Sequence, residues 1–129
     1  MILCLNTAQP EAQLYLYDGS TQLYDYSWQA HRTLAATLLA KIEEFLQSHQ
    51  VMGDDIDGLV VYQGPGSFTG LRIGCTVANT VAYARDIPVV GVPGEEWLEH
   101  GLHRLMAGEN DTTVMPFYGA EPRITTPKK

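Results

Sequence analysis

The chain has 129 residues, of which 45% are hydrophobic and 18% are charged, a composition typical of one globular domain and not of a disordered segment. Eight basic and 15 acidic residues give a net charge of −7, which disfavours direct binding to a nucleic-acid backbone. No apolar run approaches the roughly 18 residues needed to span a membrane. The two cysteines, Cys4 and Cys75, lie in apolar segments that suggest no disulfide, so we expect a cytoplasmic protein.

Three strands are predicted before the first helix. Residues 2–5 form an apolar run that ends at a polar turn, and residues 13–17 alternate between apolar and polar side chains, as a half-buried strand does. Asp18 and Gly19 are typical of a hairpin turn, and residues 22–28 form the returning strand. The chain is therefore expected to open with an antiparallel meander.

Helices and strands alternate in the rest of the chain. A helix is predicted over residues 31–49, because apolar side chains recur on one of its faces. The β-branched run at residues 58–62 predicts a central strand, and a second helix is expected over residues 68–85. A further strand at 87–92 and a last helix at 95–106 follow. The fold class is therefore α/β, with the order βββαβαβα.

The most informative segment is GPGSFTGLRIG, residues 64–74. It lies between a predicted strand and a predicted helix, where glycines permit a sharp turn and expose N–H groups at the positive end of the helix. An anion could bind there, and the candidate residues are Gly64, Gly66, Ser67, Thr69, Gly70 and Arg72. The segment is neither a Walker loop nor a dinucleotide-binding fingerprint. A tight turn with Ser67 or Thr69 as the helix cap is an equal alternative.

The second predicted helix carries more apolar surface than one sheet face covers. Its apolar arc spans about 220°, whereas a helix on a sheet needs somewhat more than about 100°. Small residues also recur every four positions, at Gly70, Gly74, Ala78 and Ala82, which permits close approach of another helix. This surplus favours a surface for a partner chain over a core helix covered entirely by its own chain.

Candidate catalytic and metal-binding groups are few. The acidic segment 54–57 lies in a predicted loop, and a solvated loop is favoured over a metal site. Glu96, His100 and His103 could share a helix face, but no further strong ligand lies nearby. His31 has no evident nucleophile to activate, and neither a Ser–His–Asp nor a Cys–His set can be assembled. We therefore predict no catalytic residue, no metal and no cofactor.

Segment 64–74 closely resembles the signature of the TsaB (YeaZ) family, whose members are non-catalytic partners in making threonylcarbamoyladenosine on transfer RNA. Further matches place the resemblance over about residues 1–106. It implies an actin-like, ribonuclease-H-like lobe with a mixed five-stranded sheet over residues 1–107. Residues 108–129 are then expected to be a linker and a tail that resembles the family's C-terminus, in a shortened form that lacks most of the second lobe.

The resemblance also implies partners. The chain would be a scaffold that docks the transferase TsaD, with the ATPase TsaE as a third member and transfer RNA contacted only indirectly. In the family the first two helices pair with equivalent helices of TsaD or of a second copy. Matching positions here predict the interface residues Leu34, Leu38, Phe45, Leu71, Cys75 and Ala78.

Two alternatives stay open at this point. The first is an ATP- or phosphate-binding enzyme that uses the turn between Gly64 and Gly70. Asn6 stands where related proteins usually have Asp, and an amide is a poor magnesium ligand, which counts against such an enzyme. The second is a stand-alone homodimer through the same helices. Which helix faces point outward is not settled by the sequence.

Overall fold

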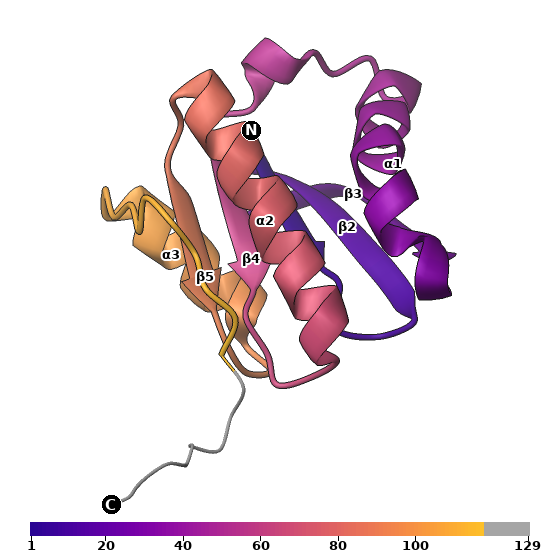
Figure 1. Ribbon diagram of the computed structural model, residues 1–129. Helices are drawn as coiled ribbons and strands as arrows, with labels where there is room; N and C mark the ends of the chain where they lie inside the picture. The colour runs from indigo at the N-terminus through magenta and orange to yellow at the C-terminus, as the bar shows by residue number, and fades with distance from the viewer. Residues whose placement is uncertain (118–129) are drawn as a thin grey trace, which may run out of the picture.

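The computed structural model of this protein describes residues 1–117 as one mixed sheet covered by helices (Figure 1). The strands are β1 (Ile2–Asn6), β2 (Glu11–Asp18), β3 (Thr21–Gln29), β4 (Gly58–Tyr62) and β5 (Val89–Val92). The helices are α1 (Leu34–Ser48), α2 (Phe68–Arg85) and α3 (Trp97–Met106), with short 3-10 turns at His31–Thr33 and Gly53–Asp55. The predicted α/β class and the order βββαβαβα are confirmed.

The strands lie in the order β3-β2-β1-β4-β5, with β1 at the centre. Strands β1, β2 and β3 pair antiparallel, and β1–β4 and β4–β5 pair parallel. A tight turn joins β2 to β3, where Gly19 has a φ of 63° that few other residues adopt. The parallel pairs are those whose strands are separated by a helix in the chain, as the geometry of a crossover requires.

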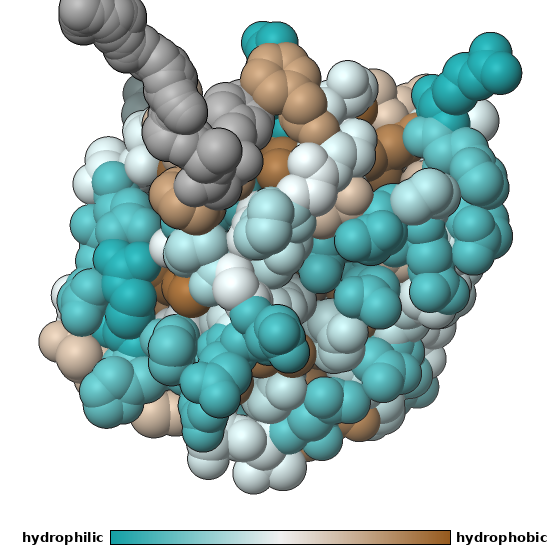
Figure 2. Space-filling view, turned by 90° about the horizontal axis from the view of Figure 1, so that it is seen from below, coloured by the Kyte–Doolittle hydropathy of each residue, from teal (hydrophilic) through white to brown (hydrophobic). Residues whose placement is uncertain are grey.

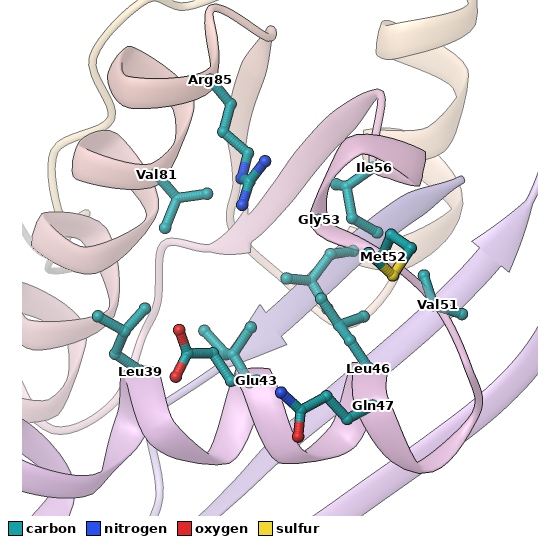
Figure 3. Close-up of a pocket in the computed structure, with 12 residues that line it drawn as sticks. Leu39, Glu43, Leu46, Gln47, Val51, Met52, Gly53, Ile56, Val81 and Arg85 are labelled. Atoms are coloured by element: carbon teal, nitrogen blue, oxygen red, sulfur yellow. The ribbon is translucent and has the colours of Figure 1, made fainter.

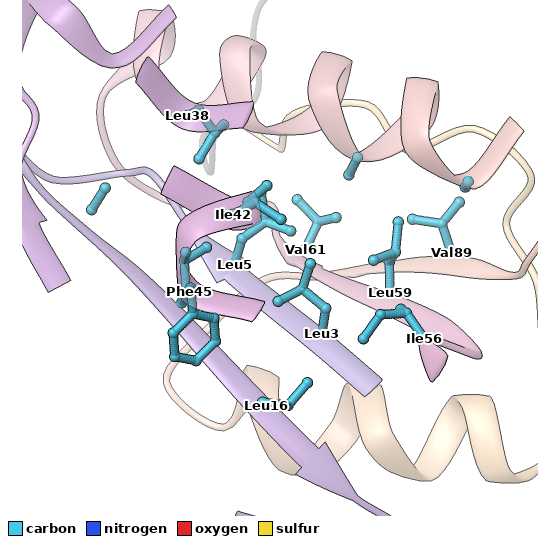
Figure 4. Close-up of a cluster of buried hydrophobic side chains, with 14 of the residues drawn as sticks. Leu3, Leu5, Leu16, Leu38, Ile42, Phe45, Ile56, Leu59, Val61 and Val89 are labelled. Atoms are coloured by element: carbon cyan, nitrogen blue, oxygen red, sulfur yellow. The ribbon is translucent and has the colours of Figure 1, made fainter. Parts of the chain in front are cut away.

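The helices cover the sheet from both faces, α1 and α2 from one side and α3 from the other (Figure 1). Successive residues of β1 alternate accordingly: Leu3 and Leu5 join the core beneath α1 and α2, whereas Cys4 lies in the smaller cluster beneath α3. Figure 4 shows the larger cluster, in which Leu38 and Ile42 of α1 lie above the sheet. Burial of these side chains fixes the position of α1 and α2 on that face.

The small residues of α2 face inward. Gly70 lies so close to the turn after β1 that a Cβ there would overlap the carbonyl oxygen of Thr7, and a Cβ on Gly74 would overlap the Thr7 side chain. The Thr7 hydroxyl, almost fully buried, donates a hydrogen bond of 2.7 Å to the Gly70 carbonyl. Ala78 and Ala82 are buried along the same side of the helix. The row therefore permits α2 to approach its own sheet, which corrects the interpretation that it serves another helix.

After α3 the chain returns along β5 toward the turn at Gly64, in a segment that we call the strap (residues 109–117). Val114 is 2% exposed and belongs to the core beneath α2. The Asn79 amide bonds both backbone groups of Val114, at 3.0 and 2.8 Å, and the Phe117 N–H donates to the Gln63 carbonyl. The part of the predicted tail that is described thus packs against the lobe, and residues 118–129 lie outside the described range.

Arg104 of α3 holds the beginning of the strap. Its guanidinium bonds Glu109 at 2.6 Å and also pairs with Asp111. Burial by itself would raise the pKa of Asp111, but hydrogen bonds from Arg104 and from the Gly91 N–H outweigh it and hold that pKa below its usual value. The ionised carboxylate is therefore the form that the folded chain stabilises.

This contact predicts a pH-dependent contribution to stability. A carboxylate whose pKa is lowered on folding stabilises the chain fully above the ordinary Asp value of about 3.9, and the contribution is lost as pH falls below that value through the folded pKa. Asp111→Asn should lower the free energy of unfolding by about 1.5 kcal/mol at pH 7, and the difference should shrink as pH falls below about 3.9. Urea denaturation across this range is the measurement, and a constant difference at every pH would contradict it.

Candidate docking face and glycine-rich turn

The six interface residues predicted from the family resemblance lie in the core. Leu34, Leu38, Phe45, Leu71, Cys75 and Ala78 are at most 5% exposed. Burial also raises the pKa of the Cys75 thiol, to about 11. The choice of these six as contact residues is therefore corrected, because the most apolar stripe of each helix is the one that the sheet covers. A charge at Leu38 or Ala78 would unfold the lobe instead of testing an interface.

A shallow groove runs between the outward sides of α1 and α2. We define this interhelix groove by its flanking residues, which are Ala35, Leu39 and Glu43 of α1 and Ile73, Val77 and Val81 of α2. Two hollows lie along it: one of about 340 Å³ near the start of both helices and one of about 270 Å³ near their ends. In Figure 3 the second hollow is lined by Leu39 and Val81 from the two helices, and the side chains of Glu43 and Arg85 also line it.

Much of the groove is apolar and exposed. Leu39 is 52% exposed, and Ile73, Val77 and Val81 are half-buried against the core. Seen from the end that carries the glycine-rich turn, apolar side chains form only small separate areas (Figure 2). The groove is therefore the better candidate for contact with another protein than the turn is.

Charges are sparse around the groove. The Arg85 guanidinium is 3.1 Å from the Asp54 carboxylate, and Arg72 lies over the ring of Phe68, 5.5 Å from its centroid. Within residues 1–117 the Glu43 side chain forms no hydrogen bond or ion pair. An apolar centre with a few charges at its edge is the composition of a protein-binding surface, and a helix is the kind of element that lies in such a groove.

The glycine-rich turn uses its own donors. The Ser67 side chain caps α2 by accepting a hydrogen bond of 3.3 Å from the Gly70 N–H, and the Ser67 N–H donates to the carbonyl of Ala8 at 2.9 Å. Gly64 has a φ of 129°, and a Cβ at this position would overlap the carbonyl oxygen of Phe117. Two of the N–H groups that an anion would need are thus already occupied, and a carbonyl oxygen lies beside the turn.

The other residues of the candidate anion site are divided between two places. Gly66 packs against the Ala8 side chain, where it leaves no room for a Cβ. Thr69 and Arg72 line the first hollow of the interhelix groove. The structure therefore places Gly64, Gly66 and Ser67 in the turn and Gly70 in the first turn of α2. Thr69 and Arg72 lie on the candidate docking face.

The acidic and histidine clusters have local partners. Asp54 pairs with Arg85, and the carboxylate of Asp57 lies 2.7 Å from the N-terminal ammonium. His100 lies 3.6 Å from Glu96 on the surface of α3. Within the described residues no three His, Cys, Asp or Glu side chains are placed to hold a metal ion. In the same part of the chain, no helix has both the length and the hydropathy to cross a membrane.

Sequence reasoning missed Leu39, Ile73, Val77 and Val81 as candidate docking residues. A usable signal was present at Leu39, which is apolar although it lies outside the buried stripe of α1. For α2 the sequence predicts a wide apolar arc, but a pattern this wide does not indicate which of its edges is exposed. The exposed edge is the one that faces α1 across the groove.

Comparison with known proteins assigns a family. Residues 28–106 match the family model described as TsaD: tRNA N6-adenosine threonylcarbamoyltransferase. The chain is 30% identical to the tRNA threonylcarbamoyladenosine biosynthesis protein TsaB of Bacillus subtilis over 103 residues, which are 79% of this chain. It is 47% identical to the tRNA N6-adenosine threonylcarbamoyltransferase of Bacillus thuringiensis over 51 residues, which are 40% of this chain and 15% of the transferase.

The fold comparison agrees with the sequence comparison. The structure of YeaZ from Pseudomonas aeruginosa superposes with a TM-score of 0.65 and 28% identity over 71% of this chain, in keeping with the predicted actin-like lobe. The chain spans less than half the length of these relatives, 45% of the Bacillus subtilis protein and 43% of YeaZ. This protein belongs to the TsaD-type family that the matching model describes, and within it to the TsaB (YeaZ) members.

Proposed function

We propose that this chain is a non-catalytic subunit that docks a TsaD-type transferase and supports threonylcarbamoyladenosine formation on transfer RNA in the cytoplasm. The observation that carries the proposal is the interhelix groove, an exposed apolar surface between α1 and α2. Membership in a family whose TsaB proteins are named for this biosynthesis supports the same reading.

Association through the groove would bury apolar side chains that are exposed or half-buried in the free chain. A stable interface buries upward of about 1,000 Å² in total, and each large apolar side chain that becomes fully buried contributes roughly 1.5–3 kcal/mol. The half-exposed Leu39 and the flanking Ile73, Val77 and Val81 would supply such contacts. Glu43 and Arg72, at opposite ends of the groove, would orient the partner helix through charge pairs at the rim.

Two features support a non-catalytic role. At the glycine-rich turn, the N–H groups of Ser67 and Gly70 already donate hydrogen bonds within the chain. Asn6 is uncharged, and its amide oxygen already accepts a hydrogen bond of 2.9 Å from the Ala8 N–H. In the part of the chain that is described, the side chains near the turn thus stabilise its shape and have no evident role in phosphate chemistry.

Further partners follow as part of the proposal. A second copy of the chain would compete for the same groove, so that a homodimer exchanges for the complex with the transferase. A TsaE-like ATPase would join the assembly once the transferase is bound. Contact with transfer RNA would be indirect, because a net charge of −7 repels the phosphate backbone.

Size-exclusion chromatography with light scattering tests the docking. The chain is measured alone and mixed with the cognate TsaD-type transferase. We expect a one-to-one complex in the mixture, formed at the expense of any homodimer of the chain. If the two proteins elute separately at concentrations of about 50 μM, well above typical dissociation constants of stable complexes, the docking proposal is wrong.

An actin-like ATP-binding enzyme is the second candidate, favoured by the 47% identity to a transferase over 51 residues. It predicts that the isolated chain binds Mg–ATP, whereas the occupied donors of the turn predict no binding. Isothermal titration with Mg–ATP at millimolar concentration separates the two. Saturable heat would establish nucleotide binding by the isolated chain and exclude our account of the turn.

A further inference from the structure

Strand β5 forms one edge of the sheet, and an open edge strand offers unpaired N–H and C=O groups to strands of other chains. We propose that the strap (residues 109–117), together with Arg104, is a built-in cover that occupies the outer edge of β5 and prevents it from pairing with another strand. The proposal concerns a different surface from the interhelix groove and does not depend on the transferase.

All four outward polar groups of β5 are satisfied by this cover. The N–H of Val89 donates to the side chain of Asn110 at 3.2 Å, and its carbonyl accepts from the Asp111 N–H at 2.8 Å. The N–H of Gly91 donates to the Asp111 carboxylate at 2.9 Å, and its carbonyl accepts from Arg104 at 3.0 Å. A second strand would need these same groups, so it finds none free.

The cover is fixed at both ends. Arg104 binds Glu109 and Asp111 at its beginning. Beyond the edge the strap turns over β5 to bury Val114, and Gly91 makes this crossing possible, because a Cβ on Gly91 would overlap the Val114 side chain. Asn79 then holds the backbone of Val114 from α2. Three side-chain hydrogen bonds and one backbone bond from the Asp111 N–H, rather than another strand, thus close this edge.

Strand β3, at the opposite edge, has no such cover. It is nine residues long and exposed along nearly its whole length. Within residues 1–117 no hydrogen bond from outside the sheet reaches the outer edge of its backbone. One edge of the sheet is therefore closed by the chain itself, and the outward amides of β3 serve as an internal reference for an open edge.

Amide hydrogen exchange followed by NMR tests the cover directly. In Asp111→Ala the amide of Gly91 should exchange at least about tenfold faster, because it loses its acceptor. In Asn110→Ala the amide of Val89 should instead exchange faster, because Asn110 is its acceptor. Glu109→Ala is the matched control: it also removes a bond to Arg104 but leaves both edge amides with their acceptors, so its rates should stay within about twofold of the wild type.

Two exchange results would overturn the proposal. One is an unchanged Gly91 rate in Asp111→Ala. The other is that, in both variants, the amides of Val90 and Val92 exchange faster by the same factor as the edge amides. That would mean that the strap stabilises the whole lobe without protecting its edge. Light scattering completes the test: the double variant Asn110→Ala/Asp111→Ala should form oligomers as concentration rises, in a Leu39→Glu background that removes association through the groove. If it behaves like Leu39→Glu alone, the strap does not guard the edge.

Discussion

Replacing Leu39 by glutamate should weaken the complex with a TsaD-type transferase by about a hundredfold, the loss expected when a central apolar contact is exchanged for a buried charge. Leu39 is 52% exposed, so the free chain tolerates the substitution. In the complex the new carboxylate would lie in the groove beside Glu43, where both would be desolvated. Titration calorimetry with the purified transferase measures the change.

A matched control lies on the other face of the sheet. Met106 of α3 is 60% exposed, so that Met106→Glu adds the same charge to a comparable apolar position away from α1 and α2. Binding of this variant should stay within about twofold of the wild type. Equal weakening by both variants would show that charge in general, and not the groove, controls the association.

The substitution Gly70→Ala should lower the unfolding free energy of the lobe by about 3 kcal/mol or more, at the upper end of what overpacking costs. The added Cβ overlaps the carbonyl oxygen of Thr7, a backbone atom that cannot turn aside. It would also separate the Thr7 hydroxyl from the Gly70 carbonyl, to which it donates in a buried position. Urea denaturation monitored by circular dichroism gives the change in unfolding free energy.

The neighbouring glycine supplies an internal test. A Cβ on Gly74 meets the side-chain oxygen of Thr7 and not its backbone, so Thr7→Ala should recover part of the stability lost in Gly74→Ala. The same second substitution should not rescue Gly70→Ala. Thr80→Ala, on the exposed side of α2, should change stability by less than about 0.5 kcal/mol. Rescue of both glycine variants, or of neither, would contradict this packing.

The secondary structure could be predicted closely because local signals agreed with the fold. The second helix was expected at the same residues, 68–85, that α2 occupies, since a capping serine begins it and its apolar positions are regular. The first helix was expected three residues too early, because His31–Thr33 forms a 3-10 turn. At the end of a helix, an apolar sequence pattern does not distinguish a 3-10 turn from the α-helix that follows it.

The docking residues could not be predicted in the same way. Periodicity shows that α2 has a wide apolar arc, but only the sheet decides which part of that arc it covers. Gly70 and Gly74 were read as a site for another helix, although the turn after β1 takes that space. The strap was also beyond sequence reasoning, because the polar side chains of Asn110 and Asp111 bond a strand about twenty residues away.

Threonylcarbamoyl transfer to transfer RNA tests the central claim most directly. The cognate TsaD-type transferase, with the remaining components of its reaction, is assayed without this chain, with the wild type and with Leu39→Glu. We predict that the chain alone is inactive, that it raises the transfer rate until one copy is present per transferase, and that Leu39→Glu does so only at far higher concentration. Transfer by the chain alone, or a rate that is the same with and without it, would contradict the account.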